Sequence, residues 1–388
     1  MRFLVLGAGR MGYAVVYDLV HNSSATQIMI CDTDEKQLER IYQQWPDKRI
    51  AMVVADVADL DESAMLMSAC DVAISCVTYK HNYDLAKLAM EAGAHFVDLG
   101  GNEDVVRKEF LLDEMAREKN VAIIPDCGLA PGMVSILAAD AVQEFDEVTE
   151  IRLRVGGLPA EPRPPLNYAL FYSVDGLINE YTEDVTVIRE GKLMRVPSLS
   201  DVETLEFPQP FGVMEAFNTS GGISTLPTTL GDKVKHLDYK AIRYPGHCQQ
   251  VRLLRDLGLM DSRSVRLNNQ ISVPPRAVLA SLLSQKLPKE ETDVVLVRVS
   301  VLGMRQGEPA EIVWEAIDYM DEKTGLSAMM RTTAFPASII AQMVADNEIT
   351  SRGTLAQETA IPTKRFLEEM RKRGVEFTRK ERNLAHAR

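Results

Sequence analysis

A glycine pattern near the N-terminus constrains the fold more than any other feature of this sequence. Gly7, Gly9 and Gly12 form a GxGxxG motif between the apolar run Arg2–Leu6 and the helical spacing of Ala14–Val20. The first glycine permits a tight turn, the second lets the backbone approach a pyrophosphate, and the third lets helix and strand pack closely. Because the N–H groups at the start of a helix attract phosphates, this context predicts a dinucleotide-binding loop.

An acidic residue after the next apolar run, Gln27–Cys31, indicates which dinucleotide is bound. Asp32 stands where a carboxylate accepts hydrogen bonds from the adenosine ribose, and it would repel a 2′-phosphate. Asp34 adds to that repulsion, so we predict NAD, with NADP as the less favoured alternative, although Arg10 could reach a phosphate of either cofactor. The other predicted cofactor contacts lie in the motif or after the third and fourth strands: Met11, Asp56, Val57, Cys76 and Val77.

Apolar runs alternate with helical segments over the first third of the chain, which predicts an α/β domain with a Rossmann-type doubly wound parallel sheet. The further strands are expected at Ile50–Ala55, Val72–Val77, His95–Leu99 and Val121–Pro125, and one of the helices at Lys108–Lys119. From Glu147 onward, extended segments joined by turns predict a second α+β domain with an antiparallel sheet. Those segments are Thr149–Gly156, Val185–Arg189, Asp238–Tyr244, Asp293–Gly303, Glu311–Met320 and Ser327–Thr333.

These patterns divide the chain into three parts. We expect residues 1–130 to form the dinucleotide-binding domain, residues 131–333 to form a second, substrate-binding α+β domain, and helices in 334–388 to return to the first domain. The basic C-terminal run Arg371–Arg382 is interpreted as a solvated face.

Composition limits the class of protein. With 46% hydrophobic residues, the 388-residue chain can build sizeable cores, which excludes a mainly disordered protein. A net charge of −13 disfavours binding to nucleic acid. The five cysteines are scattered, which predicts neither a disulfide framework nor a metal site, and no apolar run is long enough to span a membrane. We expect a soluble cytoplasmic protein acting on a small molecule.

Titratable side chains follow several of the predicted parallel strands. Tyr79, His81 and Asn82 come after one strand, Asp98 after the next, and Asp126 after the last. Since ligands of such sheets bind at the carboxyl ends of the strands, we expect these loops to meet around the nicotinamide. Tyr79, Asp98 and Asp126 are the candidate acid/base residues, with His81 left open as a fourth.

The segment 125–133, PDCGLAPGM, resembles the GLxPG segment of the saccharopine dehydrogenase family. Segments 155–159, 217–222, 224–226 and 239–247 resemble the L-lysine 6-dehydrogenases within that family, and the likeness runs over nearly the whole chain. Saccharopine reductases usually carry Asp where this chain has Ala130. The resemblance implies a Rossmann domain completed by C-terminal helices, and an inserted domain whose sheet also serves dimer contacts.

The resemblance also implies oxidation of an amino acid at a C–N bond with NAD. We expect oxidative deamination of the ε-amine of L-lysine to 2-aminoadipate 6-semialdehyde, which cyclises to piperideine-6-carboxylate, with release of ammonia and NADH by a homodimer or dimer of dimers. Arg243 suits the substrate carboxylate, because arginine gives two parallel hydrogen bonds. Further substrate contacts are expected from Asn82, Thr219, Ser220 and Tyr244. The alternatives are a saccharopine dehydrogenase and a non-catalytic NAD-binding regulatory module.

Overall fold

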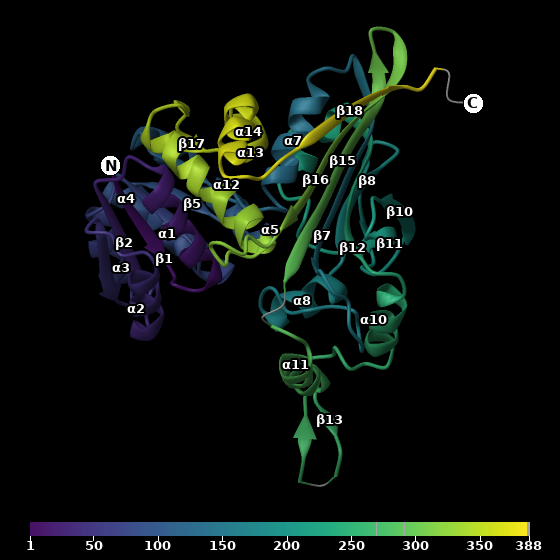
Figure 1. Cartoon of the computed structure of the whole chain (residues 1–388), viewed down its shortest axis with the longest axis horizontal. Helices are drawn as coiled ribbons and strands as arrows, with labels where there is room; N and C mark the ends of the chain where they lie inside the picture. The colour runs from purple at the N-terminus through teal and green to yellow at the C-terminus, as the bar shows by residue number, and fades with distance from the viewer. Residues whose placement is uncertain (269, 290–291, 386–388) are drawn as a thin grey trace. The chain divides into compact units, whose positions relative to one another are not determined.

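A computed structural model describes residues 1–268, 270–289 and 292–385. The contacts divide the chain into two units, each built on its own sheet (Figure 1). Unit 1 comprises Met1–Glu144, Ser224–Thr229 and Met330–Phe377, and unit 2 comprises Phe145–Ile223, Leu230–Met329 and Thr378–Arg388. By contacts the first division lies after Glu144, because helix α7 (Met133–Val142) is buried within unit 1 and packs on α13 (Gln357–Ala360). The boundary at residue 130 stays a prediction.

Within the described residues, unit 1 has a seven-stranded sheet in the order β17-β6-β5-β4-β1-β2-β3, with every neighbouring pair parallel. The strand order reverses between β1 and β4, which is where ligands of doubly wound sheets bind. The central strands are short apolar runs buried on both faces, as parallel sheets require. The strands are β1 Arg2–Leu6, β2 Gln27–Asp32, β3 Ile50–Val54, β4 Val72–Ser75, β5 His95–Asp98, β6 Ala122–Ile124 and β17 Gly353–Thr354. The predicted Rossmann-type fold class is confirmed.

The helices of unit 1 follow the predicted alternation with one difference. The expected helix Lys108–Lys119 is two helices, and the first begins earlier because Asn102 accepts hydrogen bonds from the N–H groups of Asp104 and Val105. The helices are α1 Arg10–Asn22, α2 Glu35–Gln44, α3 Leu60–Ser68, α4 Asn82–Ala92, α5 Glu103–Phe110, α6 Asp113–Glu118 and α14 Thr363–Lys372, with a 3-10 turn at Tyr79–His81.

The nine-stranded sheet of unit 2, counted over the described residues, is mixed and not purely antiparallel as predicted. Strands β7 and β12 pair in parallel, which needs a long connection, and that connection carries four other strands, two helices and a 3-10 turn. The remaining pairs are antiparallel, and β15 and β16 are joined by the two-residue turn Gln306-Gly307, with positive φ at both positions. The strands are β7 Glu147–Pro159, β8 Val185–Arg189, β9 Lys192–Val196, β10 Glu203–Phe207, β11 Gly212–Asn218, β12 Val234–Arg243, β15 Asp293–Arg305, β16 Glu308–Tyr319 and β18 Thr378–Asn383.

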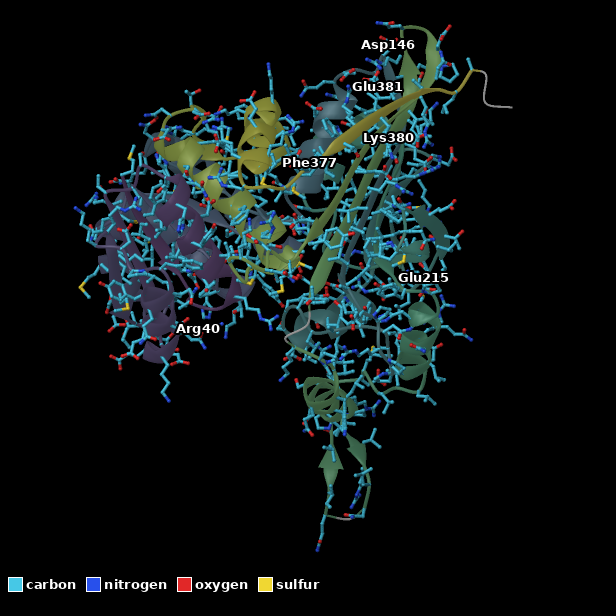
Figure 2. The ribbon with its side chains drawn as sticks, viewed as in Figure 1. Arg40, Asp146, Glu215, Phe377, Lys380 and Glu381 are labelled. Atoms are coloured by element: carbon cyan, nitrogen blue, oxygen red, sulfur yellow. The ribbon has the colours of Figure 1, made fainter. Side chains whose placement is uncertain are left out.

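The C-terminal charged run, interpreted as a solvated face, includes strand β18, which is mostly exposed. This strand pairs with β16 along the edge of the sheet. Its Lys380 forms an ion pair with Glu315, and Glu381 pairs with Arg305 and Arg379 (Figure 2). Cross-strand pairing of opposite charges therefore makes a strand of a sequence with little apolar character.

The segment Ser327–Thr333 was predicted to be extended, and this prediction is wrong. Helix α12 (Ala328–Ala345) begins there, because Asp293 on β15 accepts hydrogen bonds from the N–H groups of Ala328 and Met329 at 2.6 and 2.8 Å. A carboxylate supplied from a distant strand thus does what a local capping residue usually does.

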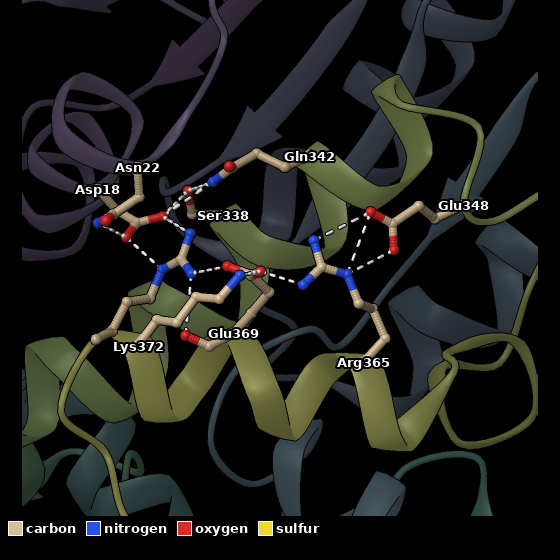
Figure 3. Close-up of polar contacts among 9 residues, drawn as sticks. Asp18, Asn22, Ser338, Gln342, Glu348, Arg365, Glu369 and Lys372 are labelled. Carbon is tan, nitrogen blue, oxygen red and sulfur yellow. Dashed lines mark hydrogen bonds and ion pairs between the residues drawn. The ribbon is translucent and has the colours of Figure 1, made fainter.

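The C-terminal helices of unit 1 are joined to α1 by an ion cluster around Asp18, a fully buried residue of α1 (Figure 3). Asp18 accepts hydrogen bonds from Ser338 and Gln342 of α12 at 2.6 and 3.0 Å, and it pairs with Arg373 at 2.5 Å. Arg373 also pairs with Glu369 of α14 at 2.6 Å. The cluster explains how a segment more than 300 residues away in sequence completes the first unit.

None of the described helices is both long enough and apolar enough to cross a lipid bilayer.

Candidate active site

The glycine loop of unit 1 has the geometry of a phosphate-binding turn. Gly7 has φ +97°, and a Cβ atom on Gly12 would stand 1.8 Å from the carbonyl oxygen of Gly7. A Cβ atom on Gly9, at the start of α1, would meet no described atom within 4 Å. The loop therefore closes tightly at two glycines and leaves room at the third, which fits a bound pyrophosphate.

The predicted cofactor residues lie around this loop. Asp32 at the end of β2 accepts a hydrogen bond from the N–H of Ala8 at 2.7 Å, and Asp34 is the N-cap of α2. A Cβ atom on Gly7 would meet Val77 at 2.9 Å and the carbonyl of Cys76 at 3.2 Å, so both follow β4 directly beside the loop.

Four other predicted cofactor residues lie at the surface or close to it. Arg10 and Asp56 are exposed, and Val57 is half-buried after β3, the strand next to β2. Met11, also half-buried, lies in the first turn of α1. Their contact with a cofactor stays a prediction.

Buried carboxyl groups meet at the carboxyl ends of β5 and β6. Asp98 is fully buried, and its Oδ1 accepts hydrogen bonds from the N–H groups of Gly100 at 2.6 Å and Asp126 at 3.2 Å. Asp126 is 2% exposed, has φ +60°, and accepts a hydrogen bond from Ser224. The helix α5 adds Glu109, which is also fully buried. The predicted pair of aspartates is thus brought together, with a third acid that the sequence analysis missed.

Burial controls the protonation of these groups. It raises the pKa of Asp98, and the backbone N–H groups that bond to its carboxylate oppose that rise. Burial and the nearby charge of Asp98 raise the pKa values of Glu109 and Asp126 well above the ordinary carboxyl range. The arrangement favours an ionised Asp98 beside two neutral acids, Glu109 and Asp126. The ionised group can accept a proton, and a neutral acid can donate one.

Of the remaining predicted residues of this edge, Asn82 lies beside the carboxyl groups, and Tyr79 and His81 form the 3-10 turn that precedes α4. Asn82 is buried at the start of α4 and accepts a hydrogen bond from Ser75 at 2.8 Å, and it lies against Asp98. Tyr79 is half-buried, and a Cβ atom on Gly101 would stand 3.2 Å from its ring. Burial lowers the pKa of His81, which favours the neutral imidazole.

A short segment, residues 224–229, belongs to unit 1 although its sequence neighbours belong to unit 2. Ser224 donates to Asp126, and Thr225 and Thr229 donate to the two oxygens of Glu358 at 2.9 and 2.6 Å. Glu358 is a buried carboxyl group of α13. The sequence analysis identified 224–226 only as a family-like segment and missed Glu358.

Two of the substrate residues predicted in unit 2, Arg243 and Ser220, contact helix α8 (Val174–Thr182). Arg243, 4% exposed at the end of β12, donates from Nε to the hydroxyl of Tyr181 at 3.2 Å. Its Nη2 lies 3.6 Å from a carboxylate oxygen of Glu180, and its guanidinium lies over the ring of Tyr168, 4.8 Å from the centroid. Arg243 is therefore a buried cation with aromatic neighbours, neither solvated nor on the sheet surface.

A neutral histidine supports this arrangement. The imidazole of His247, on α10 (His247–Asp256), lies 2.9 Å from the hydroxyl of Tyr181 through Nε2 and 2.9 Å from the carbonyl of Leu166 through Nδ1. Burial, assisted by the charge of Arg243, lowers the pKa of His247 to about 3. The tyrosine therefore donates to the imidazole and can accept from Arg243.

The polar loop after β11 reaches the same helix. Ser220 donates its N–H to the carbonyl of Glu180 at 3.2 Å and its hydroxyl to Glu183 at 3.2 Å. Thr219 is buried, and its hydroxyl has no partner among the described residues. Tyr244 donates instead to the carbonyl of Pro159 and packs in the apolar cluster around Phe211. Alternation along the strand thus separates Tyr244 from Arg243.

Glu109, Glu180 and Tyr181 are not among the residues predicted from the sequence, and of the three only Glu109 has a signal in the sequence. Glu109 falls on the face of α5 that Val106 buries, so a charged residue occupies an apolar position. The segment 174–182 was assigned no element, and only its helical fold brings Glu180 and Tyr181 to Arg243.

Comparison with known proteins identifies both halves of the chain. Residues 3–124 match the family model described as the saccharopine dehydrogenase NADP binding domain, and residues 128–375 match the saccharopine dehydrogenase C-terminal domain. The mitochondrial alpha-aminoadipic semialdehyde synthase of Bos taurus is 20% identical, over 97% of this chain and 47% of its own length. The saccharopine dehydrogenase [NADP(+), L-glutamate-forming] of Pyricularia oryzae is 22% identical, over 66% of this chain and 57% of its own.

The chain thus spans about half the length of the curated relatives that it matches. Among solved structures, the apo saccharopine dehydrogenase (L-Glu forming) of Saccharomyces cerevisiae is similar with a TM-score of 0.81 and 18% identity. That match covers 98% of this chain and 99% of the other, and it supports the fold assignment.

Proposed function

The chain belongs to the saccharopine dehydrogenase family, and on that premise we propose that it oxidises the ε C–N bond of L-lysine with NAD. Loss of the hydride leaves an imine, which water hydrolyses, so the products are 2-aminoadipate 6-semialdehyde, ammonia and NADH. The observation that carries this proposal is the buried Asp98, held at the carboxyl edge of the parallel sheet by two N–H donors. When bound, NAD supplies the acceptor for the hydride that leaves the ε-carbon.

The residues of this chain supply proton transfer and orientation. A free ε-ammonium group has a pKa of about 10.4, so it must lose a proton before its carbon can be oxidised. Asp98 takes that proton, and Asp126, neutral through burial, can donate one to the departing nitrogen. Arg243 binds the α-carboxylate of the substrate by exchanging its contact with Glu180.

Charge pairing in unit 2 supports lysine over saccharopine. Saccharopine has three carboxylates and needs several cations. Arg154 and Lys240, the buried basic groups available besides Arg243, are already paired with Glu203 and Asp238. Saccharopine is nevertheless the second candidate, because the matched family models and relatives are named for its dehydrogenases.

Two carboxyl groups, at the end of β2 and at the start of α2, support NAD over NADP. Asp32 and Asp34 place two carboxyl groups beside the loop, where a 2′-phosphate would be repelled. The family model is named for NADP, so the cofactor preference needs a direct comparison.

The test is a panel of L-lysine, saccharopine and other basic amino acids, each with NAD and with NADP, followed by absorbance of the reduced nicotinamide. We expect turnover of lysine with NAD that rises toward alkaline pH. Asp98→Asn should lower kcat/KM about 100-fold or more while NAD still binds. Turnover of saccharopine alone would establish the second candidate, and NAD binding without any turnover would establish a regulatory module.

A further inference from the structure

A carboxyl group with no donor lies behind the proposed proton acceptor. Glu109 on α5 is fully buried, and among the described residues no hydrogen-bond donor reaches either of its carboxyl oxygens. The Oδ2 of Asp98 likewise receives no hydrogen bond of good geometry there, and Asn82 is the other side chain that acts on Asp98 as a donor. The two carboxyl groups act on each other as hydrogen-bond partners. Two such groups cannot both be ionised in a buried site, whereas one carboxylic O–H supplies the missing donor.

The hydrogen bonds decide which of the two groups carries the proton. Asp98 accepts two backbone N–H groups through Oδ1, which stabilise a negative charge, and Glu109 accepts none through its carboxyl oxygens. Among the described residues, the main charges that act on Glu109 are those of Asp98 and Asp126, and both disfavour a second negative charge. The acids Glu358 on α13 and Glu103 on α5 act in the same direction on Asp126, and the same acidic surroundings raise the pKa of Cys127.

We propose that Glu109 is a positioning residue, whose carboxyl group stays protonated and donates its O–H to Asp98 so that Asp98 stays ionised. Glu109 keeps its proton throughout the reaction, and the proton taken from the substrate ends on Asp98. The role of Asp98 in this statement rests on the proposed function, but the protonation of Glu109 does not.

A buried glutamate at an active site is usually expected to gain and lose a proton, whereas here Glu109 stays neutral. If Glu109 acts only as a neutral donor, glutamine can replace it, because an amide N–H can donate to the same oxygen. Leucine cannot, and Asp98 would then lose a hydrogen bond to its charged form, which raises its pKa. Such a bond is worth about one to two pKa units.

The kinetic test compares the pH dependence of kcat/KM in four proteins: the parent, Glu109→Gln, Glu109→Leu, and Glu114→Gln as a control at an exposed glutamate of α6. Activity rises as Asp98 loses its proton, so the acidic limb reports its pKa. We expect that limb to stay in place in Glu109→Gln and Glu114→Gln. In Glu109→Leu it should move to higher pH by about one unit. A limb displaced equally in Glu109→Gln would overturn the proposal.

An infrared measurement tests the protonation without any turnover. The carboxylic C=O stretch of Glu109 should be present in the parent from about pH 6 to about pH 9 and absent in Glu109→Gln. Loss of that band in the parent within this range would show that Glu109 ionises, and would refute the proposal even if Glu109→Leu does not fold. A persistent band in a protein that oxidises no amino acid would instead reject the proposed function alone.

Discussion

At the scale of single residues, the three glycines of one motif have different tasks. Gly12 is required by the protein itself, because a Cβ atom there would collide with the backbone of Gly7. Gly9 is not required by the described structure, since its Cβ position is open. The open space at Gly9, at the N-terminus of a helix, can therefore hold a phosphate group.

This difference predicts opposite effects of two alanine substitutions. Gly9→Ala should leave the thermal midpoint within about 1 °C of the parent and weaken NAD binding about tenfold or more, because the methyl group occupies the place of the pyrophosphate. Gly12→Ala should lower the thermal midpoint by several degrees. For a domain of this size, each kcal/mol of lost stability lowers the midpoint by about 4 °C at most. Calorimetry with and without NAD checks both. Unchanged NAD affinity in Gly9→Ala would contradict the placement of the cofactor.

At the scale of elements, the start of α12 depends on a residue outside the helix. Asp293 accepts hydrogen bonds from the first two N–H groups of the helix, and it is fully buried. The local sequence, SAMMRTT, contains two threonines and was interpreted as a strand. Propensity is a weak preference, and a buried capping carboxylate outweighs it.

Removing the Asp293 cap should therefore lower the stability of the protein considerably. Asp293→Ala leaves two buried N–H groups without acceptors, so it should lower the free energy of unfolding by about 2 kcal/mol or more. Asp34→Ala removes an exposed N-cap from α2 and should cost about 0.5–1 kcal/mol. Urea denaturation of both variants makes the comparison. Equal costs would show that the cap on α12 is not energetically special.

At the scale of the whole molecule, ion pairs join sequence ends that no local pattern connects. Asp18 and Arg373 are both buried and lie in helices of the same unit, α1 and the end of α14. A buried pair need not add much stability when intact, but breaking one leaves an uncompensated charge. The cluster in Figure 3 therefore makes α12 and α14 obligatory parts of unit 1.

We predict that Asp18→Asn lowers the free energy of unfolding by about 3 kcal/mol, since Arg373 loses its buried partner. Arg107→Ala, which breaks the exposed pair with Asp104, should cost less than about 1 kcal/mol. Urea denaturation measures both, and limited proteolysis should cleave residues 330–377 faster in Asp18→Asn. A cost below that of the exposed pair would show that the cluster does not hold these helices.

The sequence alone determined the features that depend on local order: the glycine loop, the alternation that makes a parallel sheet, and the placement of Asp98 and Asp126 after neighbouring strands. Each follows from spacing along the chain, because parallel strands bring their carboxyl ends to one edge. Only the tertiary structure decided the partners of those residues. Glu180 beside Arg243 and Asp293 at the start of α12 join elements that are distant in sequence, and Glu109 meets Asp98 only through the packing of α5. Whether a buried carboxyl is ionised depends on the donors that folding brings to it, and a sequence does not specify those donors directly.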